Sequence, residues 1–190
     1  MKKIDTQKWG AFKIGDWFDV SRPVSRKQND YAPGDIGFVA SGSFNNGIQS
    51  YLSPKADDDI DKGGCITISP VDGYAFWQEK DFLGRGGAGS SIIIIRNINL
   101  NKLNALFIAS ILRFTFSNWT YTAMGNKDLV KESVILLPAT AKGEPDYGYM
   151  EEYMAKLEKQ VKKSVDLLAS TNVCVGGGRC LYIRGWFTLF

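Results

Sequence analysis

The chain has 190 residues, of which 44% are hydrophobic and 13% aromatic, so it is long and apolar enough to fold around a core of its own. Its formal net charge of +3 is compatible with nucleic-acid binding but too small to establish it. The sequence contains no histidine, which excludes Ser-His-Asp and Cys-His catalytic arrangements, histidine metal ligands and a histidine general base.

Cysteine usage and apolar runs indicate a cytoplasmic protein. Cys65, Cys174 and Cys180 include no Cys-x-x-Cys pair, so neither a zinc site nor a disulfide framework is predicted. The N-terminal residues lack the apolar region of a secretory signal. The most apolar run, residues 92–95, is far too short to cross a bilayer. We therefore expect no membrane contact and no metal.

Short β-branched or apolar runs, bounded by Gly, Pro or Asn, predict a β-rich body. Residues 12–20 alternate loosely and read as an opening strand or turn. The other predicted strands are residues 36–41, 65–69, 91–96 and 134–137. Cys65 lies in one of them and should be buried.

One helix is predicted at residues 103–116, where apolar side chains recur at spacings of three and four. Asn101 suits the N-cap of this helix. Strands followed by a helix and another strand indicate a mixed α/β (α+β) domain, and we assign it to residues 1–142. The helix should pack on the sheet.

A second, longer helix is predicted after a break at residues 139–148, where Pro145 and two glycines interrupt the pattern. The next apolar residues fall on the a and d positions of successive heptads: Met150, Met154, Leu157, Val161 and Leu168. This stripe predicts a coiled-coil-type spacer or dimerisation helix within residues 143–172, about 31 Å long. An ordinary amphipathic helix lying on its own domain is the alternative.

Residues 173–190 form a tail. Residues 181–189 align without gaps on residues 12–20, with three identities in nine positions. Two interpretations stay open: the start of a second copy of the domain, and a chance likeness between aromatic-rich strands.

Two motifs suggest chemistry but fail on their context. Residues 84–89 match Gly-x-Gly-x-x-Gly, yet a strand-like run follows where phosphate binding needs a helix, so a turn is predicted. Asp72, Glu79 and Lys80 are the residues that a small magnesium-dependent nuclease would use. Their spacing is cramped and a second firm carboxylate is missing.

The polar loop at residues 42–48, Gly-Ser-Phe-Asn-Asn-Gly-Ile, is the most informative segment. Asn and Gln amides present a donor and an acceptor side by side, which matches the major-groove edge of adenine. Asn-Asn-Gly is equally good turn chemistry, and Phe44 and Trp77 are expected to pack. The candidate DNA contacts are polar or basic loop residues: Arg22, Arg26, Lys27, Ser43, Asn45, Asn46, Gln78, Arg85 and Lys127.

The order of short motifs across residues 9–170 resembles that of the DNA-specificity subunits of type I restriction–modification systems. The motifs include Phe12-x-Ile-Gly-Asp-x-Phe18, Ser-Gly-Ser-Phe-Asn-Asn-Gly-Ile at 41–48, Phe76-x-Gln-x-x-Asp-Phe82, and Gly-x-Pro-Asp-Tyr at 143–147. The resemblance implies a target-recognition domain that reads one half of a bipartite DNA site. It also implies that the following helix pairs with a second such helix.

The resemblance further implies a subunit with no catalysis and no cofactor of its own. S-adenosylmethionine would be bound by partner DNA adenine methyltransferase subunits, and a translocating restriction subunit would join the full complex. One domain with one helix suggests either a half-subunit that forms a homodimer or a truncated longer subunit. A twofold dimer would read a palindrome. The alternatives are the magnesium-dependent nuclease and a protein-only adaptor that uses the heptad helix.

Overall fold

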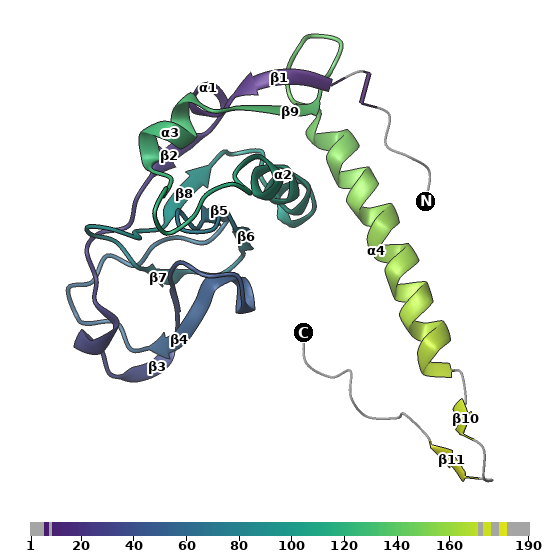
Figure 1. The fold of residues 1–190 in the computed structure, drawn as a ribbon, viewed down its shortest axis with the longest axis horizontal. Coiled ribbons are helices and arrows are strands. Elements are labelled where there is room, and N and C mark those ends of the chain that lie inside the picture. The colour runs from purple at the N-terminus through teal and green to yellow at the C-terminus, as the bar shows by residue number, and fades with distance from the viewer. Residues whose placement is uncertain (1–5, 8, 171–172, 176–178, 182–190) are drawn as a thin grey trace. The chain divides into compact units, whose positions relative to one another are not determined.

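The computed structural model describes residues 6–7, 9–170, 173–175 and 179–181 (Figure 1). Its contacts divide the chain into two compact units, residues 1–151 and residues 152–190. Each unit has its own secondary structure.

The centre of the first unit is a four-stranded antiparallel sheet in the order β2-β8-β5-β6. Helix α2 packs against strands β5 and β6 of this sheet (Figure 1). The bounds of these elements are β2 Asp19–Ser21, β5 Cys65–Ile68, β6 Ala75–Gln78, β8 Ile93–Arg96 and α2 Lys102–Thr115. The predicted mixed α/β fold with a helix packed on the sheet is confirmed.

A three-stranded sheet in the order β4-β3-β7 lies against the first. Its strands are β3 Pro33–Val39, β4 Ile48–Leu52 and β7 Phe82–Gly84, with β3 antiparallel to β4 and parallel to β7. Side chains of both sheets share one buried cluster: Val39, Cys65, Phe82, Ile92 and Ile94. This cluster packs the two sheets against each other.

A third, two-stranded sheet pairs β1, Trp9–Lys13, with β9, Val134–Pro138. A short helix adjoins each of these strands in the sequence. Helix α1, Ile14–Trp17, directly follows β1, and helix α3, Lys127–Glu132, ends just before β9. Single 3-10 turns occur at η1, Gln28–Asp30, and η2, Asn45–Gly47.

The predicted strands at residues 65–69, 91–96 and 134–137 coincide with β5, β8 and β9, whereas residues 36–41 fall on a strand that starts at Pro33. Asn101 is the N-cap of α2, since its side chain accepts hydrogen bonds from the backbone N–H groups of Leu103 and Asn104. Residues 12–20 are not one strand. A helical turn, closed by Phe18 N–H donating to the Ile14 carbonyl, separates β1 from β2 there.

Helix α4, Tyr147–Ser170, has 24 residues and is about 36 Å long. It starts before Met150, the first predicted heptad position. Its opening turn, up to Glu151, belongs to the first unit, and Met150 is fully buried in that unit. Strands β10, Val173–Val175, and β11, Arg179–Leu181, pair as an antiparallel hairpin in the second unit. Residues 182–189 of the supposed second copy lie outside the described residues.

Within the described ranges, no helix combines the length and the apolar character that a membrane span requires.

Candidate nucleic-acid interface

The loop at residues 41–47 connects β3 to β4 through two consecutive left-handed residues. Asn45 and Asn46 have φ values of 47° and 52°, a region that asparagine tolerates better than most residues. The Asn45 side-chain amide donates a hydrogen bond to the Ile48 carbonyl at 3.1 Å. The interpretation of Asn-Asn-Gly as turn chemistry is therefore correct. The N–H side of the Asn45 side-chain amide is engaged within the loop itself.

Two polar side chains, one of them buried, hold this loop. Gln78 is only 5% exposed, and its side-chain amide donates to the Asn46 carbonyl at 2.8 Å and to the Thr67 hydroxyl at 3.0 Å. The Ser41 hydroxyl donates to the Ser90 carbonyl at 2.7 Å. Because Gln78 has spent its amide hydrogens on the protein, its place in the structure is that of a support for the loop.

The tip of the loop faces solvent. Phe44 is 85% exposed, so the expectation that it packs is wrong. Asn45 and Asn46 are also exposed, while Ser43 is half-buried. An exposed ring and two exposed amides on a fixed turn can meet the edge and the face of a base without rearrangement.

A basic groove adjoins the loop. A cavity of about 580 Å³ is lined by residues 25–29 on one side and residues 85–88 on the other. Arg85 donates to the Ser90 hydroxyl, and Ser90 also receives the hydrogen bond of Ser41. The loop at 41–47, the glycine-rich segment and the basic segment around Lys27 are thus contiguous.

The glycine-rich segment is the turn between β7 and β8, as predicted. A Cβ atom at Gly86 would come within 2.1 Å of the Val24 carbonyl oxygen. Glycine is required there because the basic segment approaches the turn closely.

Arg26 is buried, unlike its neighbours in the chain. Its side chain is 1% exposed and forms an ion pair of 2.7 Å with Asp61, which is 14% exposed. The guanidinium also donates to the carbonyls of Gly84, at 3.0 Å, and of Asp59. Arg26 is therefore committed to joining the basic segment to β7 and does not offer its charge to a ligand.

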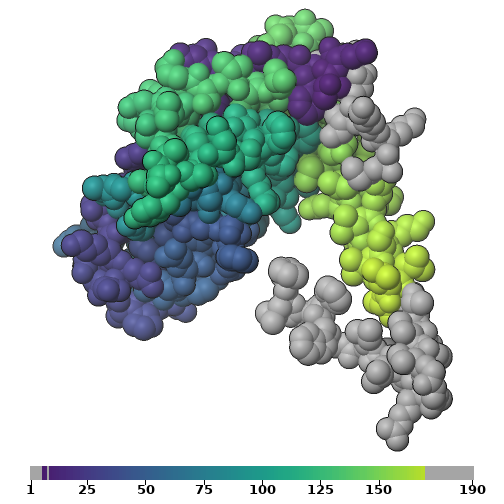
Figure 2. Space-filling view, in the orientation of Figure 1, coloured from purple at the N-terminus to yellow at the C-terminus, as the bar shows by residue number. Residues whose placement is uncertain are grey.

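Two other basic candidates lie apart from the loop. Arg22 is exposed and borders a cavity of about 350 Å³ that mixes acidic and basic side chains, including Asp59, Asp61 and Arg96. Lys127 opens α3, which packs against α1 and β2. Figures 1 and 2 show this green segment at a different end of the first unit from the blue β3–β4 region.

The residues of the nuclease alternative are separated by β6. Asp72 precedes the strand, and its carboxylate accepts a hydrogen bond from the Tyr74 N–H at 3.3 Å. Glu79 and Lys80 follow the strand, which is about 13 Å long. No group of three His, Cys, Asp or Glu in the described part of the chain is placed to hold a metal ion.

One basic residue escaped the sequence analysis. The guanidinium of Arg113, an exposed residue of α2, lies 4.0 Å from the ring centroid of Tyr74 and donates to its hydroxyl at 2.8 Å. The signal in the sequence was the alternation of Tyr74, Phe76 and Gln78 along one strand. It went unused because β6 itself was not predicted.

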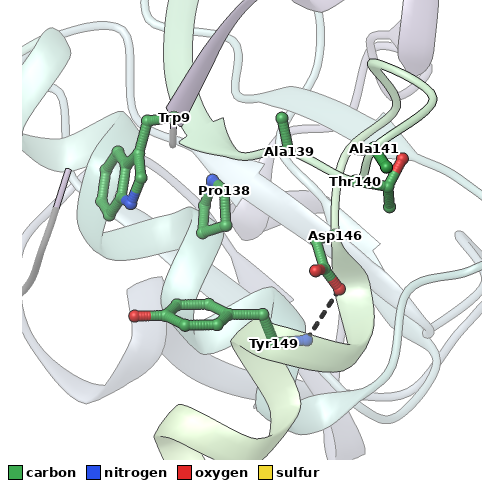
Figure 3. A pocket seen from close by; sticks show the side chains of 7 residues that line it. All are labelled: Trp9, Pro138, Ala139, Thr140, Ala141, Asp146 and Tyr149. Atoms are coloured by element: carbon green, nitrogen blue, oxygen red, sulfur yellow. Dashed lines mark hydrogen bonds between the residues drawn. The ribbon is translucent and has the colours of Figure 1, made fainter. Parts of the chain in front are cut away.

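A further cavity, of about 730 Å³, lies where β9 leads into α4 (Figure 3). Trp9, Pro138 and Tyr149 line it, and the Asp146 carboxylate at its edge accepts a hydrogen bond from the Tyr149 N–H at 2.9 Å. That carboxylate caps α4, so the cavity offers no free charged group among its lining residues.

Comparison with known proteins gives one consistent family. The family model described as "Type I restriction modification DNA specificity domain" matches residues 6–167. The specificity subunit S.BcgI of a type II restriction enzyme from Heyndrickxia coagulans is 26% identical over 167 residues, which cover 85% of this chain and 47% of that protein.

Solved structures share the fold at low sequence identity. The HsdS subunit from Thermoanaerobacter tengcongensis has a TM-score of 0.59 and 16% identity, over 90% of this chain and 42% of that one. A chain from a study of assembly and conformational transition of the type I R-M system has a TM-score of 0.61 and 16% identity, over 88% and 43%. The S subunit from M. genitalium has a TM-score of 0.51 and 13% identity, over 85% and 43%. The chain spans about half the length of the curated relative and less than half of each of these.

Proposed function

The chain belongs to the family of type I restriction–modification DNA specificity domains, and on that premise we propose that it is a sequence-specific, double-stranded DNA-binding specificity subunit. It reads one half of a bipartite site and directs DNA adenine methyltransferase subunits to it. It performs no catalysis and binds no cofactor, because S-adenosylmethionine belongs to the methyltransferase partner. A translocating restriction subunit completes the assembly, which works on DNA in the cytoplasm.

The exposed, preorganised tip at residues 41–47 is the observation that carries this proposal. A reader of base edges needs donors and acceptors that are fixed before binding, since ordering a loop on the DNA costs free energy. Gln78 and Ser41 fix the backbone of this loop from two sides. Its exposed amides, Asn45 and Asn46, are the base-reading groups of the proposal, with Ser43 beside them.

The basic residues around the tip supply contacts to phosphate, which position the protein without specifying sequence. Lys27 and Arg85 border the groove that adjoins the tip. Arg22 and Lys127 lie farther from the loop and would meet more distant phosphates. Arg26 and Gln78 act through the fold, as the supports of the basic segment and of the tip.

Helix α4 supplies a second interface in this proposal. In the second unit, Leu157 is half-buried, whereas Val161 and Leu168 are 55% and 72% exposed. An apolar stripe of this kind is stabilised by burial against another helix. We place the helix of a second copy, or of a longer partner subunit, on Met154, Leu157, Val161 and Leu168, and leave Met150 to the first unit.

The test replaces the amides and keeps the turn. Asn45→Gly with Asn46→Gly removes both side chains, and glycine accepts the left-handed backbone that both positions adopt. The recognised sequence is first found by selection from random duplexes, with the DNA adenine methyltransferase partner present. We expect the variant to lose preference for that sequence, to keep its affinity for unrelated duplex, and to melt near the unaltered temperature.

Asn118→Gly is the matched control, because Asn118 is an exposed asparagine on another loop. It should leave the preference unchanged. An Asn45→Gly/Asn46→Gly variant that still prefers the selected sequence would remove these residues from the reading surface. Failure of the unaltered chain to bind any duplex beside a methyltransferase would favour the protein-only adaptor.

A further inference from the structure

One face of strand β6 connects the loop at residues 41–47 to helix α2. Tyr74, Phe76 and Gln78 occupy alternate positions, so their side chains leave the same face of the strand. Tyr74 extends the ladder beyond β6, because its carbonyl accepts a hydrogen bond from the Ser69 N–H at 2.8 Å. These three residues are called the β6 row below.

Each member of the β6 row makes a different contact. Gln78 holds the Asn46 carbonyl at one end. Phe76 lies beneath the loop, 3.7 Å from the position that a Cβ of Gly47 would take, and its ring stacks on Tyr74 at 6.1 Å between centroids. Tyr74 carries the Arg113 guanidinium at the other end. The row therefore fixes a cation at a set position relative to the proposed base-reading tip.

The Arg113 guanidinium is held in place by an uncharged side chain. Its partner is the hydroxyl of Tyr74, and no ion pair links it to a carboxylate of the described residues. A stacked guanidinium keeps its fork of donors oriented while its charge stays uncompensated, which suits it to a phosphate oxygen.

The distance along the row fits a contact on the same duplex. Tyr74 and Gln78 are four residue steps apart along the strand, about 13 Å. Base pairs are spaced by about 3.4 Å along the helix axis. A phosphate roughly four base pairs from the bases read by the tip is therefore within reach.

We propose that Arg113, oriented by Tyr74, is a phosphate-binding residue of the DNA interface. It sets the register of the tip at residues 41–47 on the duplex. This inference rests on the proposed DNA-binding function and adds to it a contact on α2.

The experiment measures the salt dependence of binding by the full chain, with a fluorescein-labelled duplex of random sequence as the probe. Each phosphate contact contributes about 0.9 to the slope of log affinity against log salt concentration on B-DNA. Arg113→Ala should make the slope shallower by about 0.9. Arg113→Lys should restore it because the positive charge is kept.

Lys55→Ala is the matched control. Lys55 also lies over an aromatic ring, 4.6 Å from the centroid of Tyr31, but Asp58 accepts hydrogen bonds from both the Tyr31 hydroxyl and the Lys55 backbone N–H. Its charge has a carboxylate nearby, so the slope should not change. Thermal melting of every variant checks that the fold is retained.

The outcomes separate the two proposals. If the unaltered chain binds the duplex and Arg113→Ala keeps its full slope, Arg113 does not contact phosphate and this inference alone fails. The same conclusion follows if Arg113→Lys has the shallow slope of Arg113→Ala, since loss of packing would then explain both. If the unaltered chain does not bind duplex at any salt concentration, either alone or with the methyltransferase partner present, the DNA-binding function fails as well.

Discussion

Arg26 and Lys27 are neighbours in the chain and have opposite surroundings. The Arg26 guanidinium is buried against Asp61 and two carbonyls, whereas Lys27 is exposed on the groove. Breaking a buried ion pair leaves an uncompensated charge, which costs far more than the loss of an exposed cation.

The two alanine variants should therefore differ in stability. We expect Arg26→Ala to lower the free energy of unfolding by about 3–5 kcal/mol. Lys27→Ala should change it by no more than about 0.5 kcal/mol. Urea denaturation followed by circular dichroism measures both values, and equal stabilities would show that the Arg26–Asp61 pair does not hold the basic segment.

Cys65 gives a second prediction at this scale. Burial in the cluster between the two sheets raises the pKa of its thiol to about 11, so the unreactive thiol form persists well above neutral pH. Iodoacetamide at pH 8 should leave Cys65 unmodified in the folded chain and label it in guanidinium chloride. Peptide mass spectrometry reads the site directly, and rapid labelling under native conditions would contradict this burial.

The sequence predicts whether a side chain is buried only where the residues that bury it are near in the chain. Cys65 sits in an apolar run, and its burial was predicted. Arg26 depends on Asp61, 35 positions away, and nothing in the local sequence distinguishes it from Arg22 or Lys27. Phe44 was expected to pack, yet the turn formed by Asn45 and Asn46 leaves it at the tip.

Among the elements, the strands of the central sheet and helix α2 have the strongest sequence signals. Strands β5 and β8 are runs of buried β-branched residues, and α2 has both a periodic apolar face and a capping box. Strands β4, β6 and β7 were missed because they carry aromatic, polar or glycine residues in place of a β-branched run. Their positions come from pairing with partners distant in sequence, which a local pattern does not contain.

Helix α4 carries the prediction at the scale of an element. Leu157→Asp with Val161→Asp places two charges on the apolar stripe, and we expect it to abolish homodimerisation or assembly with the partner subunit. The first unit should stay folded, since neither residue belongs to it. Analytical ultracentrifugation, with and without the methyltransferase, measures the association.

Ala155→Asp with Ala169→Asp controls for the added charge. Both alanines are exposed and occupy b positions of the same heptads. This control should associate as the unaltered chain does. A sedimentation profile that Leu157→Asp/Val161→Asp leaves unchanged would rule out the stripe as an interface.

In the described part of the chain, contacts separate a first compact unit, residues 1–151, from a second that holds most of helix α4 and the β10–β11 hairpin. Two copies joined through α4 would present two identical reading surfaces related by a twofold axis. The length of α4, about 36 Å, then limits the separation of the two half-sites.

Such a homodimer should direct methylation to a palindromic site. The unread spacer should be no longer than about ten base pairs, given a rise of about 3.4 Å per pair. Methylome sequencing of cells that express this chain with its methyltransferase gives the site. An asymmetric bipartite site would instead indicate a partner with a second, different recognition domain.

The hydrogen bonds that hold the loop at residues 41–47 are accepted mainly by main-chain carbonyls, and this determines which substitutions the loop tolerates. The carbonyls of Asn46 and Ser90 receive hydrogen bonds from Gln78 and Ser41, and the Ile48 carbonyl receives one from the Asn45 side chain, so none of these supports depends on the side chain at position 44. Phe44 has an ordinary extended backbone, with φ −109°, and a solvent-facing side chain, so any amino acid except proline fits there without strain. If this tip reads DNA as proposed, target preference can change by substitution at this position without loss of stability. A saturation library there should then yield folded proteins with diversified specificity.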